Sequence, residues 1–188
     1  MRKLIYFTTI TLDGNFSGPD GGLEHFGPPP EEEHQYANDL VRGSDALVFG
    51  RRMYEVMSYW DGVDPKDPQT PRVEAEFASI YQTKPRFVLS RTLTSVDDKA
   101  VLLKDDIIDE VARLKRQDGG YLGLGCGPEL LSLFLSHGIV DEMRLLVLPI
   151  VLGEGIRLFR DIHELKSLSL LSAQTFGTGS VLLSYAAT

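Results

Sequence analysis

The sequence has little cysteine and no long hydrophobic run. Cys126 is the only cysteine among the 188 residues, so no disulfide can form within the chain. A protein without disulfides is typical of a reducing compartment. The apolar start Leu4–Phe7 is soon interrupted by Thr8, Thr9 and Asp13, which leaves it too short for a signal peptide or a membrane span. The sequence therefore predicts a cytoplasmic protein that does not enter a membrane.

Positive charge is also scarce. The chain has 19 Lys and Arg against 27 Asp and Glu, a formal net charge of −8. Nucleic-acid binding depends on a basic surface that neutralises phosphates, and this balance argues against it. A small anionic ligand can still bind where basic residues gather locally. We expect a small-molecule substrate and no nucleic-acid partner.

The sequence shows no metal-ligand spacing. The four histidines, His25, His34, His137 and His163, do not have metal-ligand spacing with one another or with Cys126. We therefore predict no metal site. Cys126 has no partner in the sequence that would activate a thiol, and its glycine neighbours favour a small residue in a tight turn over a nucleophile.

Apolar residues make up 43% of the chain and charged residues 24%, which is typical of a globular protein. The length fits one domain over residues 1–188. Five short apolar runs predict strands: Lys3–Thr11, Ala46–Phe49, Arg86–Leu89, Tyr121–Leu124 and Met143–Leu148. Five segments with helical spacing alternate with these strands: Glu31–Gly43, Arg51–Ser58, Val73–Tyr81, Asp106–Arg116 and Pro128–Gly138.

This alternation predicts an α/β fold. We expect a three-layer α/β/α arrangement with a mostly parallel central sheet covered by helices. The last strands, Leu168–Phe176 and Val181–Tyr185, flank Gly177–Gly179 and predict an antiparallel hairpin at one edge. The segment Asn15–Pro30 is rich in Gly and Pro and predicts a long loop.

Ligands of open α/β sheets bind beyond the carboxyl ends of the strands, so the residues there are the first candidates for a site. Gly50, Arg51 and Arg52 follow one strand, and Ser90 and Arg91 follow another. Guanidinium and hydroxyl groups bind phosphate oxygens through charge-assisted hydrogen bonds. The alternative is that the arginines are solvated surface charges.

A third strand is followed by a glycine-bordered helix start, Gly125-Cys126-Gly127-Pro128-Glu129-Leu130. Small residues let a phosphate approach the free N–H groups at a helix N-terminus, although such a loop is equally common as a structural turn. The loop lacks a full G-x-G-x-x-G and no Walker lysine follows it, so the spacing excludes the Rossmann and P-loop interpretations. Another nucleotide-binding α/β family is needed.

The motifs together resemble the dihydrofolate reductase superfamily, and most closely its branch that includes the riboflavin-biosynthesis reductase domain, the C-terminal part of the bifunctional deaminase-reductase. Six motifs carry the resemblance in order along the chain, and they are Thr11–Gly14, Leu47–Glu55, Phe87–Arg91, Gly125–Leu130, Gly138–Glu142 and Pro149–Gly155 with Leu158-Phe159. The set is far more specific than any one motif.

The resemblance implies an NADPH-dependent oxidoreductase that transfers hydride to a C=N or C=O group of a pterin, a pyrimidine or an opened sugar. It implies that Arg51, Ser90 and Arg91 bind the adenosine 2′-phosphate, with Gly50 and Arg52 nearby. It further implies that the loop Gly125–Leu130 binds the pyrophosphate.

By the same resemblance Asp13 and Gly14 border the nicotinamide. Asp13 is then the candidate catalytic residue, and an ordered water is the alternative proton donor. Tyr54 and Trp60 are candidates for stacking on a flat substrate ring, with core packing as the alternative. The resemblance also implies a homodimer, and the apolar strands near the C-terminus are consistent with it.

This sequence departs from the family pattern at three places. Met53 stands where a threonine is common, and Cys126 stands where the second of two glycines is usual. No carboxylate in Glu24–Asp39 aligns with the pterin-binding acid of folate reductases. We therefore expect a reductase of the 5-amino-6-(5-phosphoribosylamino)uracil reductase type, acting in riboflavin biosynthesis or on a related small heterocycle or carbonyl compound. The alternatives are a true dihydrofolate reductase and a non-catalytic nucleotide-binding module.

Overall fold

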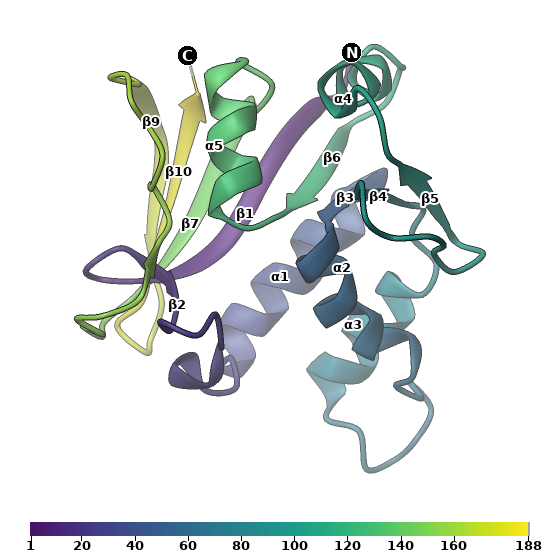
Figure 1. Ribbon diagram of the computed structural model, residues 1–188. Helices are drawn as coiled ribbons and strands as arrows, with labels where there is room; N and C mark the ends of the chain where they lie inside the picture. The colour runs from purple at the N-terminus through teal and green to yellow at the C-terminus, as the bar shows by residue number, and fades with distance from the viewer. Residues whose placement is uncertain (188) are drawn as a thin grey trace. The chain divides into compact units, whose positions relative to one another are not determined.

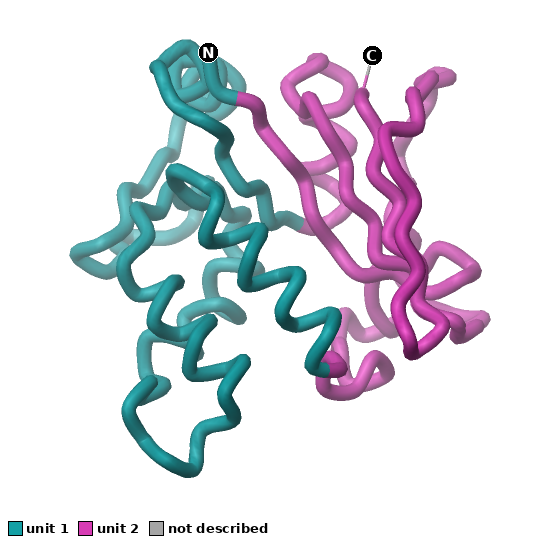
Figure 2. The backbone as a smooth tube through the Cα atoms, turned by 180° about the vertical axis from the view of Figure 1, so that it is seen from behind, with its two compact units in different colours: residues 1–2, 31–126 teal, residues 3–30, 127–188 magenta. Residues whose placement is uncertain are grey.

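The computed structural model describes residues 1–187. The chain forms two compact units, which Figure 2 shows in different colours. Unit 1 consists of residues 1–2 and 31–126, and unit 2 consists of residues 3–30 and 127–188. Most of the helices and strands are labelled in Figure 1. The expectation of one domain over residues 1–188 stays a prediction.

Unit 1 contains four parallel strands in the order β5-β4-β3-β6. They are β3 (Ala46–Gly50), β4 (Arg86–Leu89), β5 (Ala100–Leu103) and β6 (Tyr121–Gly125). The central strand β3 is almost wholly buried, as expected for a strand that pairs on both sides and is covered by helices. The register places Gly50 beside Leu89, Leu89 beside Leu103, and Phe49 beside Gly125.

The helical segments of unit 1 are α1 (Glu31–Gly43), α2 (Arg51–Met57), η2 (Ser58–Asp61), α3 (Arg72–Tyr81) and α4 (Ile107–Lys115). Three glutamates open α1, where acidic side chains interact favourably with the positive end of the helix dipole. Helices α1 and α3 pack together through Asn38, whose side-chain amide donates to the carbonyl of Val73 over 2.9 Å. The core cluster of this unit is Leu47, Phe49, Phe77 and Tyr81.

Unit 2 contains strands in the order β1-β7-β10-β9. They are β1 (Lys3–Thr11), β7 (Glu142–Leu148), β9 (Leu168–Thr175) and β10 (Val181–Ala187). Strand β1 pairs with β7 in parallel, while β10 is antiparallel to both β7 and β9. A separate small sheet joins β2 (Asn15–Ser17) to β8 (Ile156–Arg157). The helical segments are η1 (Glu24–Phe26) and α5 (Pro128–Ser136), and α5 buries Leu131 and Phe134 completely.

The predicted fold class is confirmed: the sheet is mostly parallel, with helices on both sides and a C-terminal antiparallel strand pair. The expected loop Asn15–Pro30 is wrong in part, because Asn15–Ser17 forms β2 and Glu24–Phe26 forms a 3-10 turn. Strand β5 lies in a segment for which no strand was expected. Within residues 1–187, no helix is long and apolar enough to cross a membrane.

Candidate active site

The carboxyl ends of the unit 1 strands lie level with one another. Because Gly50 pairs with Leu89 and Leu89 with Leu103, the residues that follow β3, β4 and β5 leave the sheet at the same edge. The pairing of Phe49 with Gly125 brings the end of β6 to that edge as well. The structure therefore brings Arg51, Ser90 and Cys126 to one edge of unit 1, as the sequence predicted for a ligand site.

Ser90 shapes the turn that follows β4. Its side chain is buried, and its hydroxyl oxygen accepts hydrogen bonds from the N–H groups of Thr92 over 3.2 Å and Leu93 over 3.0 Å. The carbonyl of Leu103 accepts the Ser90 N–H over 3.1 Å, which ties this turn to the end of β5. The Ser90 hydroxyl keeps its own hydrogen, which can be donated to the Thr92 hydroxyl 3.4 Å away or to an anion.

The arginines at this edge differ in their partners. Arg51 forms an exposed ion pair with Glu55 one helical turn later, at 3.4 Å. Arg52 and Arg91 are exposed, and among residues 1–187 neither is in an ion pair or a side-chain hydrogen bond. Their guanidinium groups are therefore available to an anionic ligand.

Lys104 is a further cation at this edge that the sequence did not reveal. It follows Leu103 directly, and Leu103 pairs with Leu89, so Lys104 leaves the sheet beside Ser90. Its side chain is exposed, and the described part of the chain offers it no ion pair. Only the recognition of β5 as a parallel strand could have assigned Lys104 to the site.

Gly125 is the last residue of β6, and the close packing there favours glycine. A Cβ at this position would lie 3.0 Å from the ring of Phe49 and 3.1 Å from Cγ of Met53. Met53 therefore fills the space beside Gly125, at the position where a threonine is common in the family that the motifs resemble. The next residue, Cys126, is buried, and burial raises the pKa of its thiol far above the ordinary value. A neutral thiol is a poor nucleophile, which agrees with the predicted role as a small residue in a turn.

In unit 2, α5 begins as the glycine loop predicted. Gly127 is the N-cap residue in an extended conformation, Pro128 occupies the first turn, and no side chain among the described residues caps the helix. The carboxylate of Glu129 pairs with Arg160 over 2.9 Å. Backbone N–H groups at an uncapped helix start are suited to an anion. Leu130 is partly buried in the same turn.

Asp13 is the centre of a hydrogen-bond cluster in unit 2. Its carboxylate accepts the Thr11 hydroxyl over 2.6 Å and the Asn15 side-chain amide over 2.9 Å. It also accepts the backbone N–H groups of Leu152 over 3.2 Å and Gly153 over 2.8 Å. Asp13 therefore fastens the end of β1 to the loop that follows β7.

The hydrogen bonds from Thr11 and from the Gly153 N–H lower the pKa of Asp13 well below its ordinary value, against a smaller opposing effect of burial. A carboxylate held ionised in this way does not carry a proton at neutral pH. The geometry therefore favours a positioning role for Asp13 over the proton-donor role that the sequence suggested.

Gly14, the next residue, has a φ of 82°, a conformation that glycine adopts without strain. Its carbonyl accepts the Leu158 N–H over 3.0 Å, so the turn is joined to the start of the segment after β8.

Tyr54 and Trp60 both pack against the core cluster of unit 1. The Tyr54 hydroxyl donates to Asp97 over 2.8 Å, and it also accepts the Asp97 N–H over 3.1 Å. The Trp60 ring contacts the Phe77 ring with centroids 4.7 Å apart. The structure thus gives each side chain a packing role, and their contact with substrate stays a prediction.

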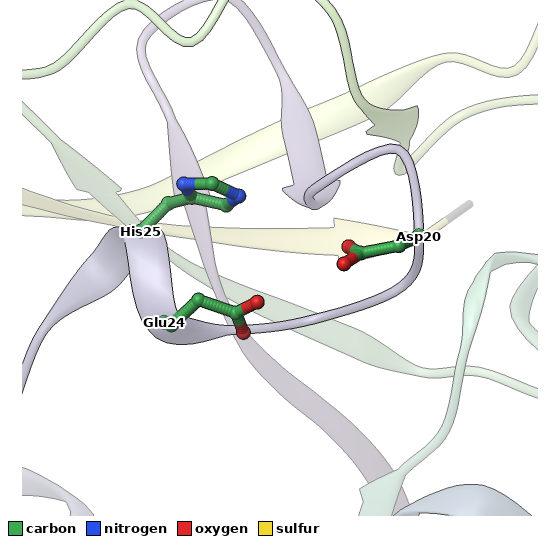
Figure 3. A group of neighbouring side chains, drawn as sticks. All are labelled: Asp20, Glu24 and His25. Carbon is green, nitrogen blue, oxygen red and sulfur yellow. The ribbon is translucent and has the colours of Figure 1, made fainter.

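Figure 3 shows three side chains of unit 2 that point towards one another, Asp20, Glu24 and His25. Their donor atoms all lie within 4.8 Å of one another, so they could share a cation. The prediction of no metal site rested on the spacing of the histidines and Cys126, and that criterion does not include acids such as Asp20 and Glu24. All three side chains are exposed, and exposed acids gather in this way without a cation, so we assign no role to them.

Comparison with known proteins identifies relatives along nearly the whole chain. The family model described as "RibD C-terminal domain" matches residues 2–182. The chain is 32% identical over 184 residues to the Bacillus subtilis (strain 168) protein named "Uncharacterized protein YyaP", covering 98% of this chain and 94% of that protein. The resemblance stated from the sequence motifs is therefore confirmed.

Solved structures agree on the fold. A putative riboflavin biosynthesis protein from Shewanella sp. PV-4 has a TM-score of 0.76 and 26% identity, covering 99% of each chain. The diaminohydroxyphosphoribosylaminopyrimidine deaminase/5-amino-6-(5-phosphoribosylamino)uracil reductase of Thermotoga maritima has a TM-score of 0.68 and 14% identity. It covers all of this chain but 57% of the Thermotoga chain, and at this identity it shows the fold alone.

The low pKa of Asp13 gives a testable pH dependence. A carboxyl group whose pKa is lowered on folding contributes stability above its ordinary pKa of about 3.9 and loses it as the pH falls below that value. We expect Asp13→Asn to unfold at lower urea concentration than the wild type at pH 7, and we expect the difference to shrink between about pH 5 and pH 2. Urea titrations over this pH range measure it.

Asp118→Asn is the matched control, because Asp118 is an exposed aspartate whose side chain makes no hydrogen bond or ion pair among residues 1–187. It should unfold like the wild type at every pH. A difference between Asp13→Asn and wild type that stays constant with pH would contradict an ionised Asp13 clamp.

Proposed function

This chain belongs to the RibD C-terminal domain family, and from that premise we propose that it is an NADPH-dependent reductase. Membership of this reductase family supports an oxidoreductase with a small-molecule substrate. The proposal also places the enzyme in the cytoplasm, in keeping with a single buried cysteine.

The observation that carries the proposal is the set of cations at the level strand ends of unit 1. Arg52, Arg91 and Lys104 are exposed and lack ion-pair partners within the described residues. The protein as a whole carries a formal charge of −8, so a local surface of unpaired cations is suited to an anionic ligand rather than explained by composition. A 2′-phosphate supplies that anion, and it is the group that distinguishes NADPH from NADH.

The remaining candidate residues have separate roles in the proposal. Arg51 and the Ser90 hydroxyl complete the 2′-phosphate site, with Gly50 allowing the chain to turn into α2. Gly125, Cys126 and the helix start Gly127–Leu130 bind the pyrophosphate through backbone N–H groups. Asp13 holds the β1 end and the Leu152-Gly153 backbone in place, and Gly14 borders the nicotinamide.

In this proposal the bound NADPH supplies the hydride, and the protein contributes binding and orientation. The interlocked turn around Asp13 keeps the backbone beside the nicotinamide rigid, which favours a fixed approach of the substrate. Because hydrogen bonds keep Asp13 ionised, the proton that follows the hydride comes from ordered water rather than from this carboxyl group.

We propose a pyrimidine-type substrate, of the kind reduced by 5-amino-6-(5-phosphoribosylamino)uracil reductases. The Thermotoga maritima protein of the same fold is named for that activity. A pterin needs partners for its ring N–H groups, since a buried unpaired donor costs about 1–3 kcal/mol. In helix α1 the late acid Asp39 is exposed and paired with Arg42, which does not suit it to that role.

Steady-state NADPH oxidation tests the substrate class. We expect a ribosylaminopyrimidine or a related carbonyl compound to be reduced faster than dihydrofolate, because Asp39, the late acid of α1, is exposed and paired with Arg42. A dihydrofolate kcat/KM within the ordinary enzyme range of about 10⁴–10⁸ M⁻¹s⁻¹ would favour a folate reductase instead. Binding of NADPH without turnover of pterins, aminopyrimidine ribosides or quinoid compounds would favour the non-catalytic module.

Arg91→Ala tests the phosphate site. Loss of one charge-assisted contact should weaken NADPH binding about ten- to a hundredfold and leave NADH binding nearly unchanged. Lys104→Gln should weaken NADPH in the same direction. Fluorescence titration with both cofactors measures the effect, and Arg116→Ala, an exposed arginine after α4, is the control. Equal losses for NADPH and NADH would show that Arg91 does not contact the 2′-phosphate.

We also propose a homodimer formed through β9. This edge strand is exposed along its whole length, and Leu170 and Leu171 are 58% and 54% exposed. Exposed apolar edge strands need a partner or they aggregate. We expect sedimentation equilibrium at micromolar concentration to give twice the chain mass of 20.9 kDa.

Leu170→Lys should shift that equilibrium towards the monomer, because it places a charge in the apolar contact. The matched control is Leu133→Lys, on the exposed side of α5. A wild-type species of monomer mass under these conditions would overturn the dimer.

A further inference from the structure

Helix α2 carries Arg51 and Arg52 and has little apolar burial of its own. None of its seven residues is fully buried, and Met53, Tyr54 and Met57 are only partly buried against the core cluster. Apolar contacts of this kind are not directional, so they fix the position of a short helix loosely. Directional contacts are therefore needed to place Arg51 and Arg52 relative to the strand ends.

Arg86, the first residue of β4, supplies one such contact. Its side chain is fully buried, and Nη1 donates to both carboxylate oxygens of Asp61, over 3.0 and 2.8 Å. Asp61 is the last residue of η2, which continues directly from α2. The buried guanidinium therefore anchors the far end of the α2–η2 segment to the sheet.

Asp97 supplies the second contact. Its carboxylate accepts Nη2 of Arg86 over 3.1 Å on one oxygen and the Tyr54 hydroxyl over 2.8 Å on the other. Its backbone N–H donates to the Tyr54 oxygen over 3.1 Å, so Tyr54 and Asp97 are joined twice. Tyr54 lies in the middle of α2, and this helix is thus tied to Arg86 through Asp97 as well as through Asp61.

The ionisation of these groups is consistent with a stable tie. Burial raises the pKa of the Tyr54 hydroxyl, which keeps it protonated and able to donate. Burial alone would raise the pKa of Asp97. The hydrogen bonds from Tyr54 and from the Lys99 N–H, together with the charge of Arg86, outweigh burial, so the pKa lies below its ordinary value and the carboxylate remains ionised.

We propose that Tyr54 and Arg86 are positioning residues for the phosphate site. They hold α2 so that Arg51 and Arg52 face the same ligand as Ser90 and Arg91, and they set the preference for NADPH over NADH without touching the cofactor. The inference rests on the proposed function, because it concerns the same 2′-phosphate site. It also gives the Tyr54 hydroxyl a role other than the substrate contact expected from the sequence.

Tyr54→Phe is the informative variant, because it removes only the hydroxyl and leaves the ring packed. Replacement of Arg86 would leave two carboxylates beside an apolar core and is expected to unfold the unit. We expect Tyr54→Phe to weaken NADPH binding about 2- to 10-fold, the effect of one ordinary hydrogen bond. NADH binding should change by less than about twofold, since NADH has no 2′-phosphate.

Tyr59→Phe is the matched control: Tyr59 lies in η2, is exposed, and its hydroxyl has no hydrogen bond among residues 1–187. It should leave both affinities unchanged. A double-mutant cycle distinguishes positioning from general loosening. If Tyr54 acts through α2, Tyr54→Phe should have a smaller effect on NADPH binding in an Arg52→Ala background than in the wild type.

The outcomes separate this inference from the proposed function. A wild-type protein that binds NADPH no more tightly than NADH overturns the proposed phosphate site and the inference with it. A wild type that prefers NADPH, together with a Tyr54→Phe variant that keeps the same ratio of NADPH to NADH affinity, overturns the inference alone. Equal weakening of both cofactors, or full additivity with Arg52→Ala, also overturns it.

Discussion

The buried guanidinium of Arg86 is the interaction on which the rest of unit 1 depends. A buried charge is unfavourable unless it is paired, and Arg86 meets this requirement with Asp61, Asp97 and the face of the Tyr81 ring, whose centroid lies 4.7 Å from the guanidinium carbon. These partners come from three separate segments of the chain. The need to neutralise one charge therefore fixes where η2, α3 and the approach to β5 meet β4.

Much of this fold could be predicted because its signals are local. Strands β3, β4 and β6 are short apolar runs, and helix α1 begins at Glu31 and ends at Gly43 as its acidic start and terminal glycine indicate. Strand β5 gives no such signal: Ala100–Leu103 is four residues long, partly exposed and flanked by charged residues. It is a strand because β4 offers it a pairing edge, and that is a tertiary effect.

The candidate site likewise has residues that the sequence could predict and residues that only the structure reveals. The rule that ligands bind at the carboxyl ends of parallel strands was enough to select Arg51, Ser90 and Arg91 from the sequence. It could not find Lys104, whose strand was missed, nor show that Asp13 accepts backbone N–H groups from a loop nearly 140 residues later. Arg86 gave no signal either, because an arginine at the start of a strand is ordinarily exposed.

The cations at the strand ends of unit 1 are distinguished by their place in the fold, and several arginines elsewhere are paired. Arg42, Arg72 and Arg160 each pair with an acid of the same unit. Within residues 1–187, Arg52 and Arg91 have no acidic partner, as is also true of the exposed Arg116 and Arg157, but Arg52 and Arg91 follow neighbouring parallel strands. Exposed cations are well solvated, so leaving them unpaired costs little when no anionic ligand is bound. In the proposed function, discrimination between NADPH and NADH depends on how accurately these cations are placed, and for Arg51 and Arg52 we propose that the buried contacts of Tyr54 and Arg86 set that placement.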